Sequence, residues 1–471
     1  MKELSITHGS ITKNILRFIF PLMITNLLQN FYSVADAIVV SMSGEADAVG
    51  AIGTTGPMTN LIINICIGCA VGTKVIAAKA IGAKDKEKVQ STLHTSIMLS
   101  IIFGIACSVI GILISPYVLK AMKNEAKLLE LANRYAITYF SGTVFISVTN
   151  FASAVFHAKA DTKTPLKVLS LCGMINVVLN LFFVLVLKMT VDGVALATVI
   201  SNAFSAIWLI WCLTKNDDMC RLNLKKLKIE KESLFDILHF GVPAAIQGAL
   251  FSLSHMVVQS SIVSVNKKLA PPNAGFAPVV KGSAAVVNIE GFGYIIINAV
   301  TQAAITFTGQ NVGANQYNQV KKVLYSCYFI SFIMSTLFAA AVLILKDPIL
   351  SLFGVYNAKP GSLDYIAYNT AKTRLLYVFM PYFLGAFQEI GSGTMQGLGK
   401  AFTATAISLA GAVAFRIIWM FTVFKVWQTL EAVFLVYPIT WLLPAVAHFI
   451  CITIILKKKN ALQNKDVILE S

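Results

Sequence analysis

Charged residues are scarce in this chain. They make up 13% of its 471 residues, whereas a soluble protein carries about 25%. Hydrophobic residues account for 56% of the sequence. This composition argues against a soluble domain and predicts an all-helical protein that crosses a membrane many times.

Catalytic motifs are absent as well. The sequence has neither the HExxH motif of zinc peptidases nor the GxSxG motif of serine hydrolases. Cys66 and Cys69 have CxxC spacing, but no second pair or nearby histidine completes a metal or redox site. We therefore expect a protein that is not an enzyme and that needs no cofactor.

Long apolar blocks recur along the chain, each long enough to cross a bilayer at about 1.5 Å of rise per residue. They predict about twelve transmembrane helices in two lobes of six. The blocks span residues 15–40, 54–76, 93–114, 137–156, 168–187, 194–213, 238–265, 284–307, 323–345, 375–395, 402–424 and 432–456.

The loops predict the orientation of the chain. If successive helices alternate in direction, lysine and arginine are concentrated on the side that carries both termini. Because these residues favour the cytoplasmic side, we expect both termini in the cytoplasm and the chain in a prokaryotic cytoplasmic membrane. No small-residue cleavage site follows the first apolar block, so we expect no cleaved signal peptide. The net charge of +16 indicates contact with membrane lipids rather than with nucleic acid.

The two halves of the chain repeat. Gly82 and Ala83 follow the second apolar block as Gly313 and Ala314 follow the eighth. Six crossings in each half insert both halves the same way up, and transporters built from such repeats bind substrate near the membrane midplane. The predicted division is an N-terminal lobe (1–213), a cytoplasmic linker (214–235) and a C-terminal lobe with a short cytoplasmic tail (236–471).

Two glycine pairs have the spacing of close helix contacts. Gly68 and Gly72 lie four residues apart, as do Gly393 and Gly397. Small residues at this spacing let two helix backbones approach closely, so we expect tight packing at both places.

The first apolar block contains one ionisable residue in its interior, Asp36. At about 100° per residue it shares a helix face with Asn26, Gln29, Asn30 and Ser33. A carboxylate inside a membrane costs about 2.5–3.5 kcal/mol on insertion scales. We therefore expect this face to line water or another helix rather than lipid.

Six segments, taken in order, carry a family resemblance. The chain resembles the multidrug and toxic compound extrusion (MATE) family over nearly its whole length. The segments are VADAIVVSMSG (34–44), VGTKVIAAKAIGAKD (71–85), AKADTKTPLKV (158–168), GVALATVISNAFSAI (193–207), TGQNVGANQ (308–316) and SGTMQGLGKA (392–401).

The resemblance implies a secondary antiporter that exports cationic, amphipathic compounds, driven by inward flow of protons or sodium. It also implies a V-shaped pair of lobes with alternating access. Asp36 matches the acidic residue of the family's coupling-ion site, and its partners from the fifth helix correspond to Asn176 and Asn180. The alternative for Asp36 is a hydrogen bond to these asparagines that only aligns helices.

Two further acids lie inside apolar blocks, Glu290 and Glu389. We expect them to contribute to substrate binding or to a polar cleft. A salt bridge to Arg416, which lies inside an apolar block, is the alternative for Glu290. The other residues assigned to the cleft are Asn30, Gln29, Tyr294 and Gln396.

Asp36 is the one carboxylate within the apolar blocks of the first half. Sodium favours several oxygen ligands, so we predict proton coupling, with sodium at Asp36 as the alternative and no other metal. A lipid-linked oligosaccharide flippase of the same wider superfamily is the runner-up; it would need several buried arginines or lysines for pyrophosphate. An ion channel would need a filter repeat or a multimer, and we expect a monomer.

Overall fold

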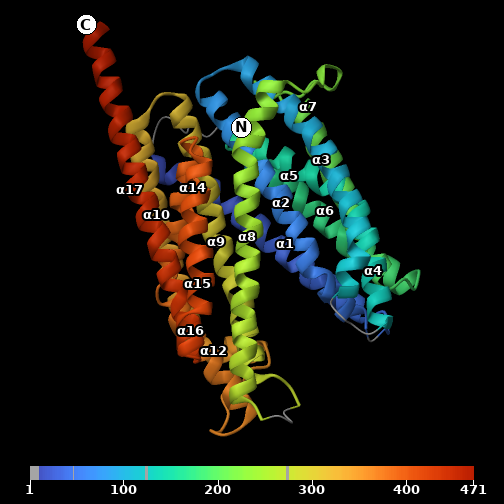
Figure 1. Ribbon diagram of the computed structural model, residues 1–471. Helices are drawn as coiled ribbons and strands as arrows, with labels where there is room; N and C mark the ends of the chain where they lie inside the picture. Colours follow the sequence, from blue (N-terminus) through green and yellow to red (C-terminus); the bar gives the residue numbers. More distant parts are fainter. Residues whose placement is uncertain (1–9, 46, 122–125, 272–274, 471) are drawn as a thin grey trace. The chain divides into compact units, whose positions relative to one another are not determined.

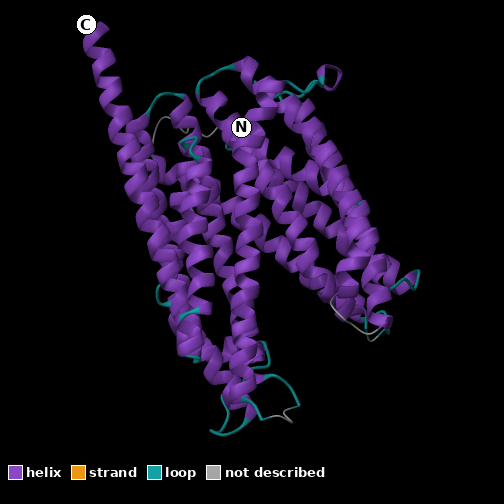
Figure 2. Cartoon of the chain, in the orientation of Figure 1, coloured by secondary structure: helices purple, strands orange, loops and turns teal. Residues whose placement is uncertain are grey.

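The computed structural model describes residues 10–45, 47–121, 126–271 and 275–470 (Figure 1). These residues form helices joined by loops, with no β-strand among them (Figure 2). The predicted all-helical class is therefore confirmed.

Packing divides the described chain into two compact units. Unit 1 consists of Leu16–Gly248 and Gly309–Asn315, and unit 2 of Ser10–Ile15, Ala249–Thr308 and the chain from Gln316 onwards. The two lobes and the linker predicted from the repeat are continuous stretches of sequence, whereas each compact unit combines separate stretches. The division into lobes and linker therefore stays a prediction.

The described residues of the first half form seven α-helices. They are α1 (Ile11–Ser41), α2 (Ala48–Gly82), α3 (Lys86–Ala121), α4 (Ala126–Ser141), α5 (Thr143–Ala158), α6 (Lys163–Leu181), which continues as a π-helical turn (Phe182–Val186), and α7 (Val191–Thr214).

The second half follows a 3₁₀ turn at Leu224–Lys226. Its helices are α8 (Lys231–Leu269), α9 (Pro278–Gly313), α10 (Tyr317–Ile344), α11 (Lys346–Leu352), α12 (Leu363–Phe379), α13 (Tyr382–Gly397), α14 (Ala401–Ser408), a π-helical turn (Leu409–Ala414), α15 (Phe415–Phe421), α16 (Val423–Val426) and α17 (Leu430–Glu470).

Ten helices of the described chain are long and apolar enough to cross a membrane, or eleven if α4 and α5, bent by 47°, form one span. The predicted block at 375–395 is not among them. The helix breaks there at Pro381, which has no N–H to donate, and α12 and α13 are only 17 and 16 residues long. Along the chain, α12 and α13 correspond to the bent pair α4 and α5 of the first half.

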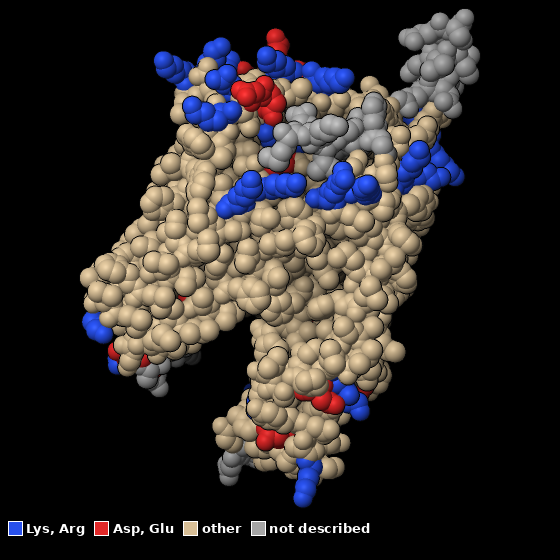
Figure 3. All heavy atoms as spheres, turned by 180° about the vertical axis from the view of Figure 1, so that it is seen from behind, with Lys and Arg blue, Asp and Glu red and all other residues tan. Residues whose placement is uncertain are grey.

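The outer face of α3 is the kind of surface that lipid covers. Ile102, Ile105, Val109 and Leu113 recur at helical spacing and are each at least 50% exposed. On the side of the molecule seen in Figure 3, charged side chains gather near the ends of the helices and leave the surface between them largely uncharged. Both observations fit a multi-pass membrane protein.

Two pairs of turns confirm the internal repeat. The chain adopts a left-handed backbone conformation at Lys84 (φ 56°) after α2 and at Asn315 (φ 55°) after α9. It does so again at Ala160 (φ 65°) after α5 and at Gly399 (φ 82°) after α13. In each case the turn satisfies carbonyl groups at the end of a helix.

Both glycine pairs pack as predicted. A Cβ on Gly68 or Gly72 would overlap the backbone of α8, at Ala245 and Ile237. A Cβ on Gly397 would lie 2.9 Å from the carbonyl oxygen of Ile305 in α9, and one on Gly393 would lie 2.9 Å from Thr301. Within each unit, therefore, helices meet at these glycines because no side chain separates them.

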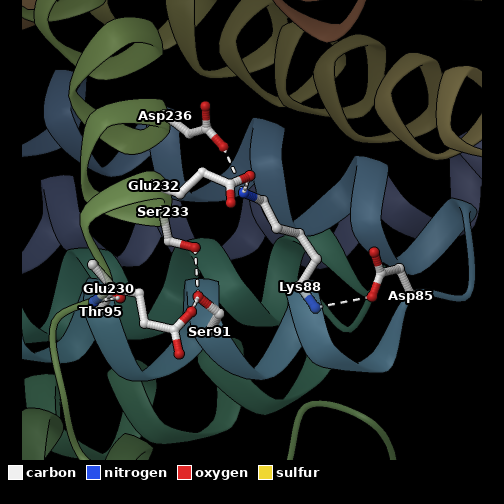
Figure 4. Close-up of polar contacts among 8 residues, drawn as sticks. All are labelled: Asp85, Lys88, Ser91, Thr95, Glu230, Glu232, Ser233 and Asp236. Atoms are coloured by element: carbon white, nitrogen blue, oxygen red, sulfur yellow. Dashed lines mark hydrogen bonds and ion pairs between the residues drawn. The ribbon is translucent and has the colours of Figure 1, made fainter.

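The segment between α7 and α8 is held against α3. Lys88 forms ion pairs of 2.7 Å with both Glu232 and Asp236, at the start of α8. Figure 4 shows the three side chains pointing toward one another. Gln90 donates hydrogen bonds to the carbonyl oxygens of Met219 (2.6 Å) and Arg221 (3.0 Å).

The next turn of α3 continues this attachment. Ser91 hydrogen-bonds Ser233 at 2.6 Å and donates to the carboxylate of Glu230. The backbone N–H of Glu230 donates to Thr95 at 3.0 Å. The start of α8 is thereby fixed to α3 within unit 1. We call this set the linker clamp: Lys88, Ser91, Thr95, Glu230, Glu232, Ser233 and Asp236 (Figure 4).

Candidate functional site

Asp36 lies on α1 and is half-buried. Its carboxylate accepts a hydrogen bond of 2.5 Å from Nδ2 of Asn180, which is fully buried on α6. In the part of the chain that the structure describes, no lysine or arginine forms an ion pair with Asp36. The carboxylate is therefore held by an amide and not neutralised by a cation.

A chain of amide and hydroxyl groups extends from this contact. Asn180 Nδ2 also donates to Oδ1 of Asn176 at 3.3 Å, one turn earlier on α6. Asn176 Nδ2 donates in turn to the Thr198 hydroxyl of α7 at 3.4 Å. The three residues that the family resemblance assigned to ion binding thus lie together, and Thr198, which the sequence did not single out, joins them.

We call these hydrogen-bonded groups of Asp36, Asn180, Asn176 and Thr198 the Asp36 relay. One of its atoms has no hydrogen-bond partner. Asn180 Oδ1 is buried and accepts no hydrogen bond. Leaving a buried polar oxygen unpaired costs about 1–3 kcal/mol. Asn180 Oδ1 can therefore accept one more hydrogen bond, for example from an acid O–H beside it.

Two other residues that the sequence assigned to the cleft lie on the same helix as Asp36. Gln29 and Asn30 are exposed on α1. Neither forms a side-chain hydrogen bond with the Asp36 relay in the described structure. Their part in substrate binding stays a prediction.

Glu290 in α9 pairs with Arg374 of α12. The contact is bidentate, with Nε to Oε1 at 2.7 Å and Nη2 to Oε2 at 3.1 Å. Arg374 also donates to Ser283 (2.7 Å) and to the hydroxyl of Tyr437 (3.5 Å). The hypothesis of a Glu290–Arg416 bridge is therefore wrong, although an ion pair does form.

The sequence missed Arg374 because of where the apolar run begins. Asn369, Lys372 and Thr373 precede it, so the predicted membrane block started at Leu375. In the structure α12 starts earlier and buries the Arg374 side chain, which is 2% exposed. Arg374 and Arg416 are thus both buried side chains on helices of unit 2. A possible role of Glu290 in substrate binding stays a prediction.

Glu389 in α13 has no basic partner among the described residues. Its carboxylate accepts a hydrogen bond of 3.4 Å from Nε2 of Gln388. Gln396, two turns along the same helix, is buried and donates to Ser392 at 3.4 Å. Tyr294 of α9 is 50% exposed. These side chains offer an uncompensated carboxylate with aromatic and amide groups in the same unit.

Arg416 follows the π-helical turn of Leu409–Ala414 and is 2% exposed. Its Nη2 donates to the Thr440 hydroxyl at 3.1 Å. The guanidinium carbon lies 4.8 Å from the centre of the Tyr437 ring, on α17. Its environment is therefore a cation–π contact and one neutral acceptor.

The MatE family model matches residues 21–182 and 274–422. Probable multidrug resistance protein YoeA of Bacillus subtilis (strain 168) is 26% identical over 409 residues, which cover 85% of this chain and 84% of the relative. The FAD transporter of Shewanella oneidensis is 22% identical over 380 residues, covering 77% of this chain and 78% of the relative.

A solved structure has the same fold. A MOP superfamily transporter from Pyrococcus furiosus Vc1 (DSM3638) matches with a TM-score of 0.87 and 22% identity, covering 98% of this chain and 99% of that one. Together these matches place the chain among membrane transporters rather than enzymes.

Proposed function

The chain belongs to the MatE family, and on that premise we propose that it exports cationic, amphipathic compounds across the cell membrane by antiport with protons. The name of the Bacillus relative, a probable multidrug resistance protein, supports export of toxic compounds. The observation that carries proton coupling is Asp36, a carboxylate in an apolar helix that is hydrogen-bonded to Asn180 and paired with no described cation.

Protonation of Asp36 would change which residue donates the hydrogen bond between Asp36 and Asn180. The ionised carboxylate accepts the N–H of Asn180, as observed. A protonated carboxyl group has an O–H that needs an acceptor, and Asn180 Oδ1 is buried without a partner. An amide has both N–H and C=O groups. Rotation of the Asn180 amide by half a turn would therefore present its C=O to the O–H of protonated Asp36. The relay to Asn176 and Thr198 would then rearrange with it.

This change supplies a basis for alternating access. A charged Asp36 is stabilised where water or a ligand reaches it, whereas the neutral acid tolerates a closed, dry site. A ligand or proton that prefers one conformation shifts the equilibrium by its difference in affinity for the two. The proton would thus drive the return step of the transport cycle.

A proton fits this site better than sodium does. Sodium favours several oxygen ligands, and the groups beside Asp36 offer one carboxylate and the Asn180 amide oxygen. The described residues contain no cluster of three or more acidic, histidine or cysteine side chains that could hold a metal ion.

The substrate's cation would be attracted to an uncompensated carboxylate. Glu389 lies inside an apolar helix of unit 2 and has no basic partner among the described residues, and Tyr294 offers an exposed ring for stacking or cation–π contact. Glu290 is neutralised by Arg374 and would have to leave it in order to bind a drug. Gln396, Gln29 and Asn30 complete the proposed polar surface.

The oligosaccharide flippase remains the second candidate because two arginines are buried in the second half. A pyrophosphate site would need several free guanidinium or ammonium groups. Arg374 is already satisfied by Glu290, Ser283 and Tyr437. Arg416 alone leaves donors free, so drug export is favoured.

Replacement of Asp36 tests the proposal. Asp36→Asn keeps a similar shape but cannot bind and release a proton, so proton-driven uptake of a cationic dye into inverted membrane vesicles should fall to the level of vesicles without the protein. The control is Glu87→Gln, an exposed acid on the first turn of α3, which should transport normally. Wild-type rates in the Asp36→Asn protein, at equal protein content, would rule out the assignment.

A further inference from the structure

Arg416 is a permanent charge that this structure leaves largely unsatisfied. A guanidinium group stays protonated in proteins and has five N–H donors. The Arg416 side chain donates one hydrogen bond, from Nη2 to Thr440 at 3.1 Å. Its Nε and Nη1 atoms are buried and have no hydrogen-bond partner. No carboxylate of the described residues forms an ion pair with it.

The same unit shows what a satisfied buried arginine looks like. Arg374 is equally buried, at 2% exposure, yet all three of its nitrogens donate. Two of them hold the carboxylate of Glu290 side by side, at 2.7 and 3.1 Å. The fold can therefore give a fully buried arginine a carboxylate partner, but no carboxylate of the described residues lies within ion-pair distance of Arg416.

The local backbone is also unusual. The π-helical turn Leu409–Ala414 interrupts the helix and ends two residues before Arg416. Such turns are rare and occur frequently at functional sites, because the extra residue changes the direction of the side chains that follow. On the other side, Tyr437 presents its ring to the guanidinium carbon at 4.8 Å.

We propose that Arg416 binds a carboxylate group of the transported compound, with the ring of Tyr437 beside it. The carboxylate would take the place at Arg416 that Glu290 takes at Arg374. This inference rests on the proposed function and deepens it: the substrates include amphipathic compounds that carry an acid group besides their cation.

Access to this site depends on conformation. Nε and Nη1 of Arg416 are closed off from solvent in this structure. A carboxylate reaches them only when the helices that cover the guanidinium separate. Binding would therefore favour the open conformation, as a ligand favours the state to which it binds more tightly.

A matched pair of dyes tests the proposal directly. Rhodamine 110 has a cationic ring system and a free carboxylate, and rhodamine 123 is its methyl ester. Binding of each dye to the purified full chain is measured by fluorescence polarisation without any ion gradient. Arg416→Gln should weaken binding of the acid about tenfold, the scale of a lost charge-assisted contact, and leave binding of the ester unchanged. Arg416→Lys should recover part of the loss.

Controls separate the site from general effects of charge. Arg134→Gln removes an arginine that is 50% exposed and paired with Asp192 in unit 1. This variant should bind both dyes as tightly as the wild type does. Free benzoate should displace the acid from the wild type but not the ester; if inorganic phosphate displaces it equally well, the site is a general anion site and the assignment to a substrate carboxylate is wrong.

Two further results would overturn the inference. One is an equal effect of Arg416→Gln on both dyes. The other, which applies even if both Arg416 variants fail to fold, is absence of benzoate competition in the wild type. The assay measures binding alone. If the wild type shows no proton-driven transport but Arg416→Gln still weakens binding of the acid and not of the ester, the proposed coupling is wrong and this site is not affected.

Discussion

Single residues decide where charge is tolerated in this protein. Arg374 and Glu290 neutralise each other in unit 2, with side chains that are 3% and 18% exposed. Asp36 is instead held by an amide in unit 1. The first arrangement is suited to holding helices α9 and α12 together, and the second leaves a carboxylate that can gain or lose a proton.

The ion pair predicts a specific pattern of stability. Glu290→Gln leaves Arg374 as an uncompensated buried charge, which should destabilise the protein by about 3–5 kcal/mol. Adding Arg374→Gln to Glu290→Gln should recover part of that loss, because the pair is coupled. Melting temperatures of the two single variants and the double variant in detergent measure the coupling. Additive losses would show that the pair does not act as a unit.

Residue contacts were predicted from the sequence to different degrees. The Asp36–Asn180 contact joins residues 144 positions apart, and no spacing within one sequence reveals such a pair; the family resemblance supplied it. Arg374 was missed since the polar turn before it obscured the start of α12. The sequence does not predict that Asn180 Oδ1 is unpaired, because this depends on which side chains surround the amide in the fold.

At the scale of helices, packing depends on a few glycines that the sequence does reveal. Gly72→Ala would drive a Cβ into the Ile237 carbonyl group, and we expect a loss of about 1–3 kcal/mol. Gly53→Ala on the same helix meets nothing within 4 Å and should be neutral or stabilise by up to about 1 kcal/mol. Thermal unfolding in detergent compares the two; similar melting temperatures would refute the close contact of α2 and α8.

The linker clamp predicts a dependence of stability on pH. Contacts from Lys228 and Ser91 hold the pKa of Glu230 below its usual range, which is about 4.3. A lowered pKa in the folded state means that the carboxylate stabilises the fold above that pH. The stabilisation is lost as the pH falls through the lowered value.

The measurement is the difference in melting temperature between wild type and Glu230→Gln. It should stay constant from pH 7 down to about 4.3 and shrink below that. Ser91→Ala, which removes a hydrogen bond to Glu230, should reduce the difference at neutral pH. A difference that grows on acidification would contradict this account of the clamp.

Helix boundaries show where apolar pattern stops being informative. The long apolar blocks were predicted well, because their length alone indicates a span. The break between α12 and α13 at Pro381, and the π-helical turns in the α6 and α14 segments, were not predicted. Both depend on how neighbouring helices satisfy the freed backbone groups, which hydropathy does not record.

For the whole molecule, the repeat was the most reliable prediction. Gly82 and Gly313 marked it in the sequence, and the left-handed turns at Lys84 and Asn315 repeat it in the structure. A turn that occurs in both halves needs the same local backbone conformation in each, so similar residues recur at that place in the sequence. The chemistry of the two halves differs: Asn180 holds Asp36, whereas Arg374 pairs with Glu290. A repeat cannot predict that difference.

The central claim is that protons, acting through Asp36, drive export. The direct measurement is efflux of rhodamine 123 from loaded proteoliposomes in sodium-free buffer after the outside is acidified, beside a second set with an inward sodium gradient at equal pH on both sides. We predict rapid efflux in the first set, abolished by a protonophore and by Asp36→Asn, and none in the second. Efflux under the sodium gradient alone, with none under the proton gradient, would contradict the account.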